Sequence, residues 1–276
     1  MLCFVERRMM GRLGADPSAP YVATRRTNQE KIPWKNLPRI ENRVEAEFLR
    51  PVVLGESILP YRNFQPFEAV VPVTDKGEVL DAEAAANRGF DGLHGWMSAA
   101  ERVWNANAES GPMTLIGRWN YHNELGAQFP LVSRRVVYAA SGTNPAACIL
   151  KEPAVIEHSL YWSKPDTKKE ARYSPLFSTA KQRVSAANPF NLAGNGAREI
   201  STRSCSTCRF HASTPTIPCT RTSPKPRARR KLSPPPWPLP ENTKFQRARG
   251  LVRAALTDAG VAQRIDALVA RLLDGG

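Results

Sequence analysis

Apolar residues recur at helical spacing in the middle and at the end of the chain. In residues 79–108 this spacing predicts an amphipathic helix, with one apolar face made of Leu93, Trp96, Met97, Ala100, Val103 and Trp104. After residue 245 two further stripes follow, Leu251, Val252, Ala255 and Leu256, then Val261, Ile265, Leu268, Val269 and Leu272. Because Gly260 separates them, the C-terminus is expected to be a helical hairpin, or one helix kinked at Gly260.

Short β-prone runs separated by turn residues make up much of the remaining sequence. Residues 67–73 (FEAVVPV) predict a strand that Pro72 interrupts. Residues 112–163 contain the runs MTLIG, RVVYAAS, AACIL, AVIEH and SLYW, bounded by Gly, Asn and Pro. Residues 25–64 are expected to be irregular because of Pro33, Pro38, Pro51 and Pro60, and residues 168–187 to be partly helical.

These patterns predict an α+β fold. Its main part is a mixed, β-rich domain with flanking helices over residues 25–197. Residues 1–24 carry little pattern and are expected to be poorly ordered. Residues 239–276 form the C-terminal helical segment, and residues 198–238 separate it from the domain.

Residues 198–238 do not resemble the sequence around them. From residue 200 to 238 there are eight Lys or Arg, eight Pro and twelve Ser or Thr, with no Asp or Glu. Such a composition buries too little apolar surface to offset the entropy of ordering the chain. This stretch is therefore expected to be a disordered, basic insert, and it supplies more than half of the net charge of +14.

The genetic code offers an explanation for this insert. If each true codon begins at the third base of the codon as read, the text from Ile200 is compatible with FDKVVFDLPIPRFDPNDP. That is a strand-like apolar run followed by proline punctuation, as in a folded domain. Two compensating insertions or deletions, near residue 198 and near 232–238, would account for it. We therefore interpret the stretch as out of frame; the alternative is a genuine basic linker.

The insert also carries a possible set of zinc ligands, Cys205, Cys208, His211 and Cys219. Zinc prefers four such groups, but a single C-x-x-C is a weak signal without a compact fold around it. No metal site is expected here, and a basic zinc- or nucleic-acid-binding module centred on the insert remains an alternative.

Without the insert the chain is only mildly basic, which permits a polyanionic partner without requiring one. No run of about 18 apolar residues predicts a membrane span, and no signal peptide is recognisable at the N-terminus. Five cysteines without a secretion signal favour a reducing cytoplasm. No Gly-rich phosphate loop or other catalytic motif is present, so no catalytic residue is expected.

Two groups of basic residues are candidates for DNA contact. Beside Trp34, basic and amide side chains suited to phosphates and base edges gather at Arg25, Arg26, Asn28, Lys31 and Lys35. Arg134 and Arg135 precede a β-prone run. For both groups the alternative is an ordinary solvated segment. His158, Tyr161 and Trp162 are expected to fill a core, and the alternative is that they line a site.

The in-frame parts resemble the C-terminal half of adenine-N(6) DNA methyltransferases of restriction–modification systems. The resemblance rests on five segments that span most of residues 25–273 outside the insert: RRTNQEKIPWKNLP (25–38), NRVEAEFLRPVVLGESILPYR (42–62), RVVYAASGTNPAACIL (135–150), AVIEHSLYW (154–162) and FQRARGLVRAALTDAGVAQRIDALVARLL (245–273). The run FLRPVVLGESILPYR is similar to the start of the family's target-recognition domain. The out-of-frame FDKVVFDLPIPRFDP is also similar to a family segment.

The resemblance implies a function in methyl transfer from S-adenosylmethionine to a flipped-out adenine. The family needs a Gly-rich cofactor loop and an Asn-Pro-Pro-Tyr/Phe motif. Neither is present, because Asn144-Pro145 and Asn188-Pro189 lack a second proline. We therefore expect a truncated fragment that recognises double-stranded DNA and holds no cofactor itself. The alternative is a specificity subunit that acts with a separate catalytic chain.

Overall fold

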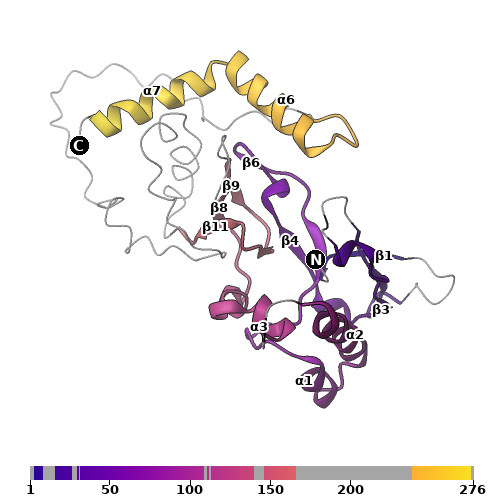
Figure 1. The fold of residues 1–276 in the computed structure, drawn as a ribbon. Coiled ribbons are helices and arrows are strands. Elements are labelled where there is room, and N and C mark those ends of the chain that lie inside the picture. Colours follow the sequence, from indigo (N-terminus) through magenta and orange to yellow (C-terminus); the bar gives the residue numbers. More distant parts are fainter. Residues whose placement is uncertain are drawn as a thin grey trace, which may run out of the picture.

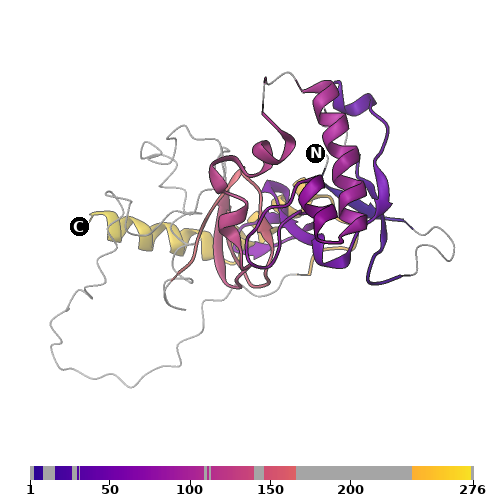
Figure 2. The same ribbon diagram turned by 90° about the horizontal axis from the view of Figure 1, so that it is seen from below.

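A computed structural model describes residues 3–8, 16–26, 30, 32–108, 111, 113–139, 146–165 and 238–274. In these ranges small β-sheets are mixed with helices, so the expected α+β class is confirmed at that level (Figure 1). Both views place the α1–α2 layer on one side of the molecule and the last helix on the other (Figure 2). None of the described helices is long and apolar enough to span a membrane.

The N-terminal residues form an antiparallel sheet of β1 (Val5–Arg7), β2 (Tyr21–Thr24) and β3 (Glu41–Arg43), in the order β1-β2-β3. Val5 and Val22 are buried in the main hydrophobic core. The prediction of poor order for residues 1–24 was therefore wrong for both strands. Runs of three and four residues are too short to show an alternating pattern, and long-range burial decides their structure.

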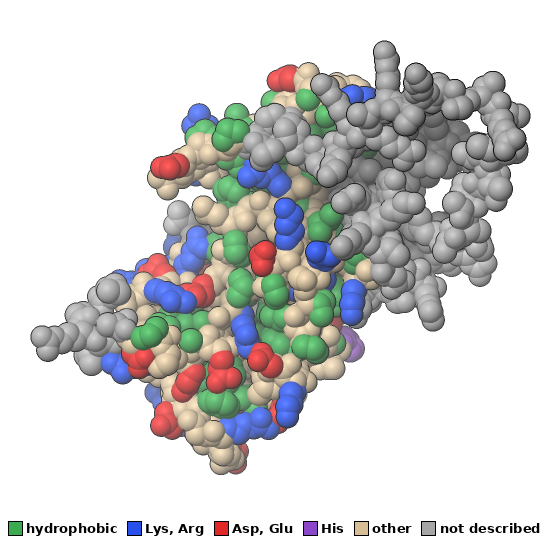
Figure 3. Space-filling view, turned by 180° about the vertical axis from the view of Figure 1, so that it is seen from behind, with side chains coloured by type: hydrophobic (Ala, Val, Ile, Leu, Met, Phe, Trp, Pro, Cys, Tyr) green, Lys and Arg blue, Asp and Glu red, His purple; other side chains and the backbone are tan. Residues whose placement is uncertain are grey.

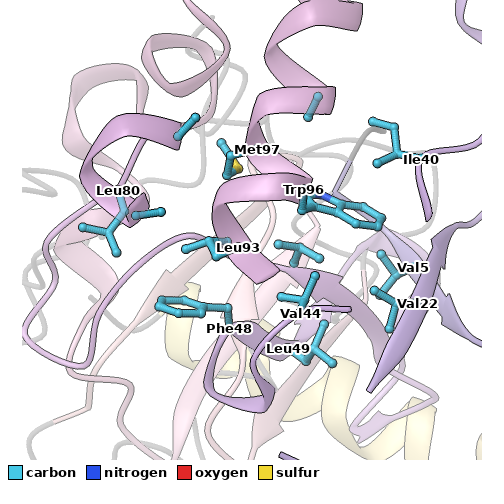
Figure 4. Packing of buried hydrophobic residues seen from close by; sticks show 14 of the residues in the cluster. Val5, Val22, Ile40, Val44, Phe48, Leu49, Leu80, Leu93, Trp96 and Met97 are labelled. Carbon is cyan, nitrogen blue, oxygen red and sulfur yellow. The ribbon is translucent and has the colours of Figure 1, made fainter. Parts of the chain in front are cut away.

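The predicted helix over residues 79–108 is confirmed, but as two helices, α1 (Ala82–Asn87) and α2 (Asp91–Asn107). Gly89, with φ +78°, separates them. The side chain of Asp81 caps α1 by accepting a hydrogen bond from the Ala84 amide. Figure 4 shows the apolar face of α2 in the core, with Trp96 directed toward Val22 of β2.

The central sheet joins distant parts of the chain around β4 (Leu49–Val53). This strand pairs antiparallel with β7 (Phe67–Val70) and parallel with β10 (Val155–Ile156). Residues 25–64 are therefore less irregular than expected, because they contain strands. Pro51, which was expected to prevent regular structure, lies within β4. The short hairpin β5 (Ile58–Leu59) and β6 (Arg62–Asn63) follows β4.

A third sheet has the order β11-β8-β9 and consists of β8 (Arg135–Ala139), β9 (Ala147–Leu150) and β11 (Leu160–Ser163). These strands and β10 confirm four of the five β-prone runs in residues 112–163. The run MTLIG was predicted wrongly, because it leads into helix α3 (Leu115–Trp119). The Thr114 hydroxyl caps α3 by accepting from the Gly117 amide, a local bond that outweighs the β propensity of Met, Leu and Ile.

Single turns of 3-10 helix connect several of these elements: Trp34–Asn36, Ala46–Phe48, Gly55–Ser57, Tyr121–Asn123 and Gly126–Gln128. They tighten the loops between the sheets and leave short connections. Two of them carry exposed polar side chains: Trp34–Asn36 lies between β2 and β3, and Tyr121–Asn123 follows α3.

The C-terminal segment consists of α6 (Phe245–Asp258) and α7 (Val261–Asp274). Helix α6 packs on Leu59 of β5 through Ala248, Val252 and Leu256. The two helices continue end to end with a bend at Gly260, φ +63° (Figure 1). The expected hairpin is therefore replaced by the kinked alternative. Residues 168–187 and, apart from Pro238, the insert at 198–238 lie outside the described residues.

Candidate nucleic-acid interface

Between β2 and β3, the part of the loop around Trp34 is anchored to α2 by a pair of tryptophans. The Trp34 ring stacks on Trp104 of α2, with 5.6 Å between ring centroids and 25° between ring planes. The Trp104 indole Nε1 donates to the Met113 carbonyl at 2.9 Å. An aromatic stack in which the indole N–H has a hydrogen-bond partner is a stable contact. The stack therefore anchors the Trp34 part of the loop to α2.

Arg26 holds the same loop from inside. Its Nη1 donates to the Trp34 carbonyl at 2.7 Å, and its Nη2 donates to the Leu37 carbonyl and, at 3.0 Å, to the Pro38 carbonyl. Nη1 also lies 3.4 Å from the carboxylate of the buried Glu30. These bonds use the guanidinium to shape the backbone. Arg26, predicted as a DNA contact, therefore has a structural task in the loop.

The outer side of this loop keeps basic and apolar side chains accessible. Lys35 is exposed, and Ile32 has 75% of its surface exposed, which is the largest exposure among the described large hydrophobic residues. The half-buried Arg25 lies with its guanidinium carbon 4.4 Å from the centroid of the Phe67 ring. The other two candidates of this group, Asn28 and Lys31, lie outside the described residues.

The second candidate pair divides into one surface and one core residue. Arg134 is exposed immediately before β8, whereas Arg135 is completely buried. Arg134 lies outside the strand and has φ of +62°, whereas Arg135 is the first residue of β8. The prediction of a DNA contact was wrong for Arg135, since a buried guanidinium cannot reach a phosphate.

Arg135 belongs to a buried polar network that the sequence did not reveal. Its Nη2 donates to the Ala154 carbonyl, its Nη1 lies 3.4 Å from the Gln128 amide oxygen, and its guanidinium carbon lies 5.2 Å from the Trp162 ring centroid. Gln128 also bonds both backbone groups of Ile156, accepting from its amide at 2.8 Å and donating to its carbonyl at 2.9 Å. The network thus joins β8, β10 and the turn before them.

An exposed turn at Tyr121–Asn123 is a further feature that sequence reasoning missed. Tyr121, His122 and Asn123 are all exposed, and His122 and Asn123 have φ of +53° and +61°. The two rings of Tyr121 and His122 meet edge to face, 4.1 Å apart at 64°. The available sequence signal was the Asn-Tyr-His-Asn series, because Asn and His adopt positive φ more readily than most residues.

The segment at His158 divides between surface and core. Tyr161 and Trp162 are buried, which confirms the core prediction for both. The core prediction was wrong for His158, whose side chain is 64% exposed. His158 Nδ1 forms an ion pair with the Glu157 carboxylate. This hydrogen bond raises the pKa of His158, and the same contact contributes to lowering the pKa of Glu157 against the desolvation that opposes it.

Metal binding receives no support from the part of the chain that the structure describes, where no three His, Cys, Asp or Glu residues gather as ligands. The four alternative zinc ligands, Cys205, Cys208, His211 and Cys219, lie outside it. The described Cys148 is buried, and desolvation raises the pKa of its thiol to about 12, so it is an inert core residue.

Charge is mixed on one face of the described residues. Figure 3 shows Lys and Arg interspersed with Asp and Glu on the face in view.

Comparison with known proteins identifies no relative. No protein-family model matches the chain, and no curated protein matches it.

Proposed function

We propose that this chain is the DNA-recognition part of an adenine-N(6) DNA methyltransferase of the restriction–modification type. It binds double-stranded DNA and leaves methyl transfer to residues that this sequence does not contain. The observation that carries this proposal is the anchored part of the β2–β3 loop at residues 32–38, which exposes Ile32 and Lys35 while Arg26 and Trp34 hold it to the rest of the protein.

An anchored segment at residues 32–38 suits DNA binding because it loses little conformational freedom when the duplex docks. Lys35 and Arg25 supply cations for phosphate oxygens. Ile32 supplies an apolar tip of the kind that contacts a thymine methyl group or a base step. The loop coincides with the segment RRTNQEKIPWKNLP (25–38), which is also one of the segments that resemble the methyltransferase family.

Catalysis would come from a region bearing the cofactor loop and the Asn-Pro-Pro-Tyr/Phe motif, which would bind S-adenosylmethionine and the flipped adenine. That region would belong to the same polypeptide or to a separate catalytic chain. In both arrangements the present chain positions the duplex.

The test is fluorescence anisotropy of a labelled 30-base-pair duplex titrated with the full chain between 50 and 200 mM salt. Wild-type protein is expected to bind with an affinity that falls steeply with salt, because bound phosphates release counterions. Lys35→Ala should reduce the slope of log affinity against log salt by about 1. The control is Lys76→Ala, which removes an exposed lysine from the Val73–Val79 turn and should leave the slope unchanged. A wild-type chain that does not bind duplex DNA would refute the proposal.

Methyl transfer gives an independent check. Purified chain with isotopically labelled S-adenosylmethionine should transfer no label to duplex DNA. Transfer should require addition of a catalytic chain that carries both motifs. Labelling by the present chain alone would contradict its assignment as a recognition part.

A further inference from the structure

We propose that the exposed turn Tyr121–Asn123 reads base edges in the bound duplex, as a specificity element separate from the phosphate-binding β2–β3 loop. This inference rests on the proposed function, since it assumes that the chain binds DNA. It is carried by the backbone conformation of the turn, by the bonds that fix it, and by the side chains at its tip.

The backbone of the turn has a conformation that favours glycine. His122 and Asn123 both have positive φ, and the turn is closed by the Glu124 amide, which donates to the Tyr121 carbonyl at 3.1 Å. Consecutive positive φ values are tolerated by Gly and Asn with little strain and by other residues at a cost. At position 122 the chain nevertheless places an imidazole, where glycine would satisfy the backbone.

The turn is held rigidly from below. The Asn120 side-chain oxygen accepts from the Leu125 amide at 3.2 Å and the Gly126 amide at 2.9 Å, and its Nδ2 donates to the Asn123 side-chain oxygen at 3.3 Å. Gly126 permits a close approach, because a Cβ there would lie 2.7 Å from Asn123 Oδ1 and 3.0 Å from the Gly77 carbonyl oxygen.

The next turn fastens this segment to the sheets. Gln128 bonds both backbone groups of Ile156 and is itself buried. The turn Tyr121–Asn123 is thereby tied to the sheet region through the segment that follows it. Base recognition requires contacting side chains that are held in place in this way.

The side chains at the tip suit base edges. The His122 imidazole presents a donor and an acceptor to a base edge, whereas the Asn123 oxygen accepts from Asn120 and belongs to the support of the turn. Tyr121, 43% exposed, adds an aromatic face for contact with a base or sugar. Exposed Arg118, one turn earlier in α3, adds a cation for a phosphate or a guanine edge.

A glycine substitution separates base reading from structural support. His122→Gly relieves the backbone while removing the imidazole. We expect this variant to keep or raise the melting temperature, because positive φ is unstrained in glycine. If the imidazole reads a base, the same variant should lose about tenfold or more of its preference for the target sequence.

The experiment is selection of bound duplexes from a random-sequence pool by the full chain, followed by sequencing and by affinity measurements on the enriched duplex and on mixed-sequence duplex. Wild-type protein should enrich a defined sequence. His122→Gly and Tyr121→Ala should bind mixed-sequence duplex within about twofold of wild type but lose the enrichment. Lys35→Ala is the matched control, which should weaken binding to all duplexes and still enrich the wild-type sequence.

The outcomes distinguish the two proposals. Wild-type protein that binds no duplex overturns both. Wild-type protein that binds but enriches no sequence, or turn variants that enrich the wild-type sequence with unchanged preference, overturn base reading by the turn and leave DNA binding in place. Thermal unfolding of each variant shows that the loss is one of recognition, because His122→Gly should be at least as stable as wild type.

Discussion

Replacement of Arg135 by methionine tests whether this arginine is a core residue or a DNA contact. Methionine has similar length and no charge, so it fills the space but removes the bond to the Ala154 carbonyl and the interaction with Gln128. One buried carbonyl left without this donor costs about 1–3 kcal/mol. The lost contact with the Trp162 ring costs about 1–2 kcal/mol more.

An opposing effect reduces this loss. Burial of a guanidinium is itself unfavourable by several kcal/mol, on the order of the bonds that compensate it, and methionine removes that penalty. We therefore expect Arg135→Met to lower the free energy of unfolding by about 1–2 kcal/mol. Arg135→Ala also leaves a cavity, so its loss should be about 2–3 kcal/mol larger.

The assay is urea unfolding followed by tryptophan fluorescence, together with duplex affinity below the unfolding transition. The control is Arg134→Met, which changes an exposed residue and should alter stability by less than about 0.5 kcal/mol. The folded fraction of Arg135→Met should bind DNA as wild type does. A methionine variant of unchanged stability and much weaker DNA binding would refute the assignment of Arg135 to the core.

Further variants test the supports of α2 and the pH dependence of one ion pair. The carboxylate of Glu45 accepts from two N-terminal amides of α2, each at 2.8 Å, so Glu45→Gln should lower stability by about 1 kcal/mol, measured by urea unfolding. Gly92→Ala places a methyl group 2.7 Å from a backbone carbonyl and should lower stability by about 1–3 kcal/mol; in the same assay Gly250→Ala, with no atom within 4 Å, should raise it by about 0.5–1 kcal/mol. The raised pKa of His158 means that its pair with Glu157 contributes fully below the unfolded histidine pKa of about 6.5 and is lost as pH rises through the folded value. Thermal unfolding from pH 5 to 9 should show that His158→Ala removes this dependence, and an unchanged profile would contradict it.

The sequence pattern was sufficient to predict a helix whose apolar face repeats over several turns. It was also sufficient to predict strands whose β-prone residues form a clear run. The α2 face could be predicted because Leu93, Trp96, Met97 and Ala100 repeat over two turns and are all buried. The strands β8 to β11 could be predicted because branched and aromatic residues gather between turn signals. In both cases local composition and long-range burial favour the same structure.

The errors arose where tertiary contacts decide the outcome. Val5 and Val22 become core residues only when β1, β2 and α2 meet. The composition of Arg134-Arg135 could not show which arginine enters the core, because that depends on the register of β8. For the candidate site, the basic β2–β3 loop could be identified from composition, but the bonds of Arg26 to distant backbone carbonyls could not.

The parallel pairing of β4 with β10 has a consequence for the order of folding. Val52 meets Val155, so the two strands close a loop of about one hundred residues, and contacts of such sequence separation form slowly. On the ribosome the pairing edge of β4 must wait, open, until β10 has been synthesised. Pro51 lies at the unpaired end of that edge, and a residue without an amide hydrogen hinders association of open strand edges. The proline in this strand thus removes one amide donor through which another open strand edge could pair with β4.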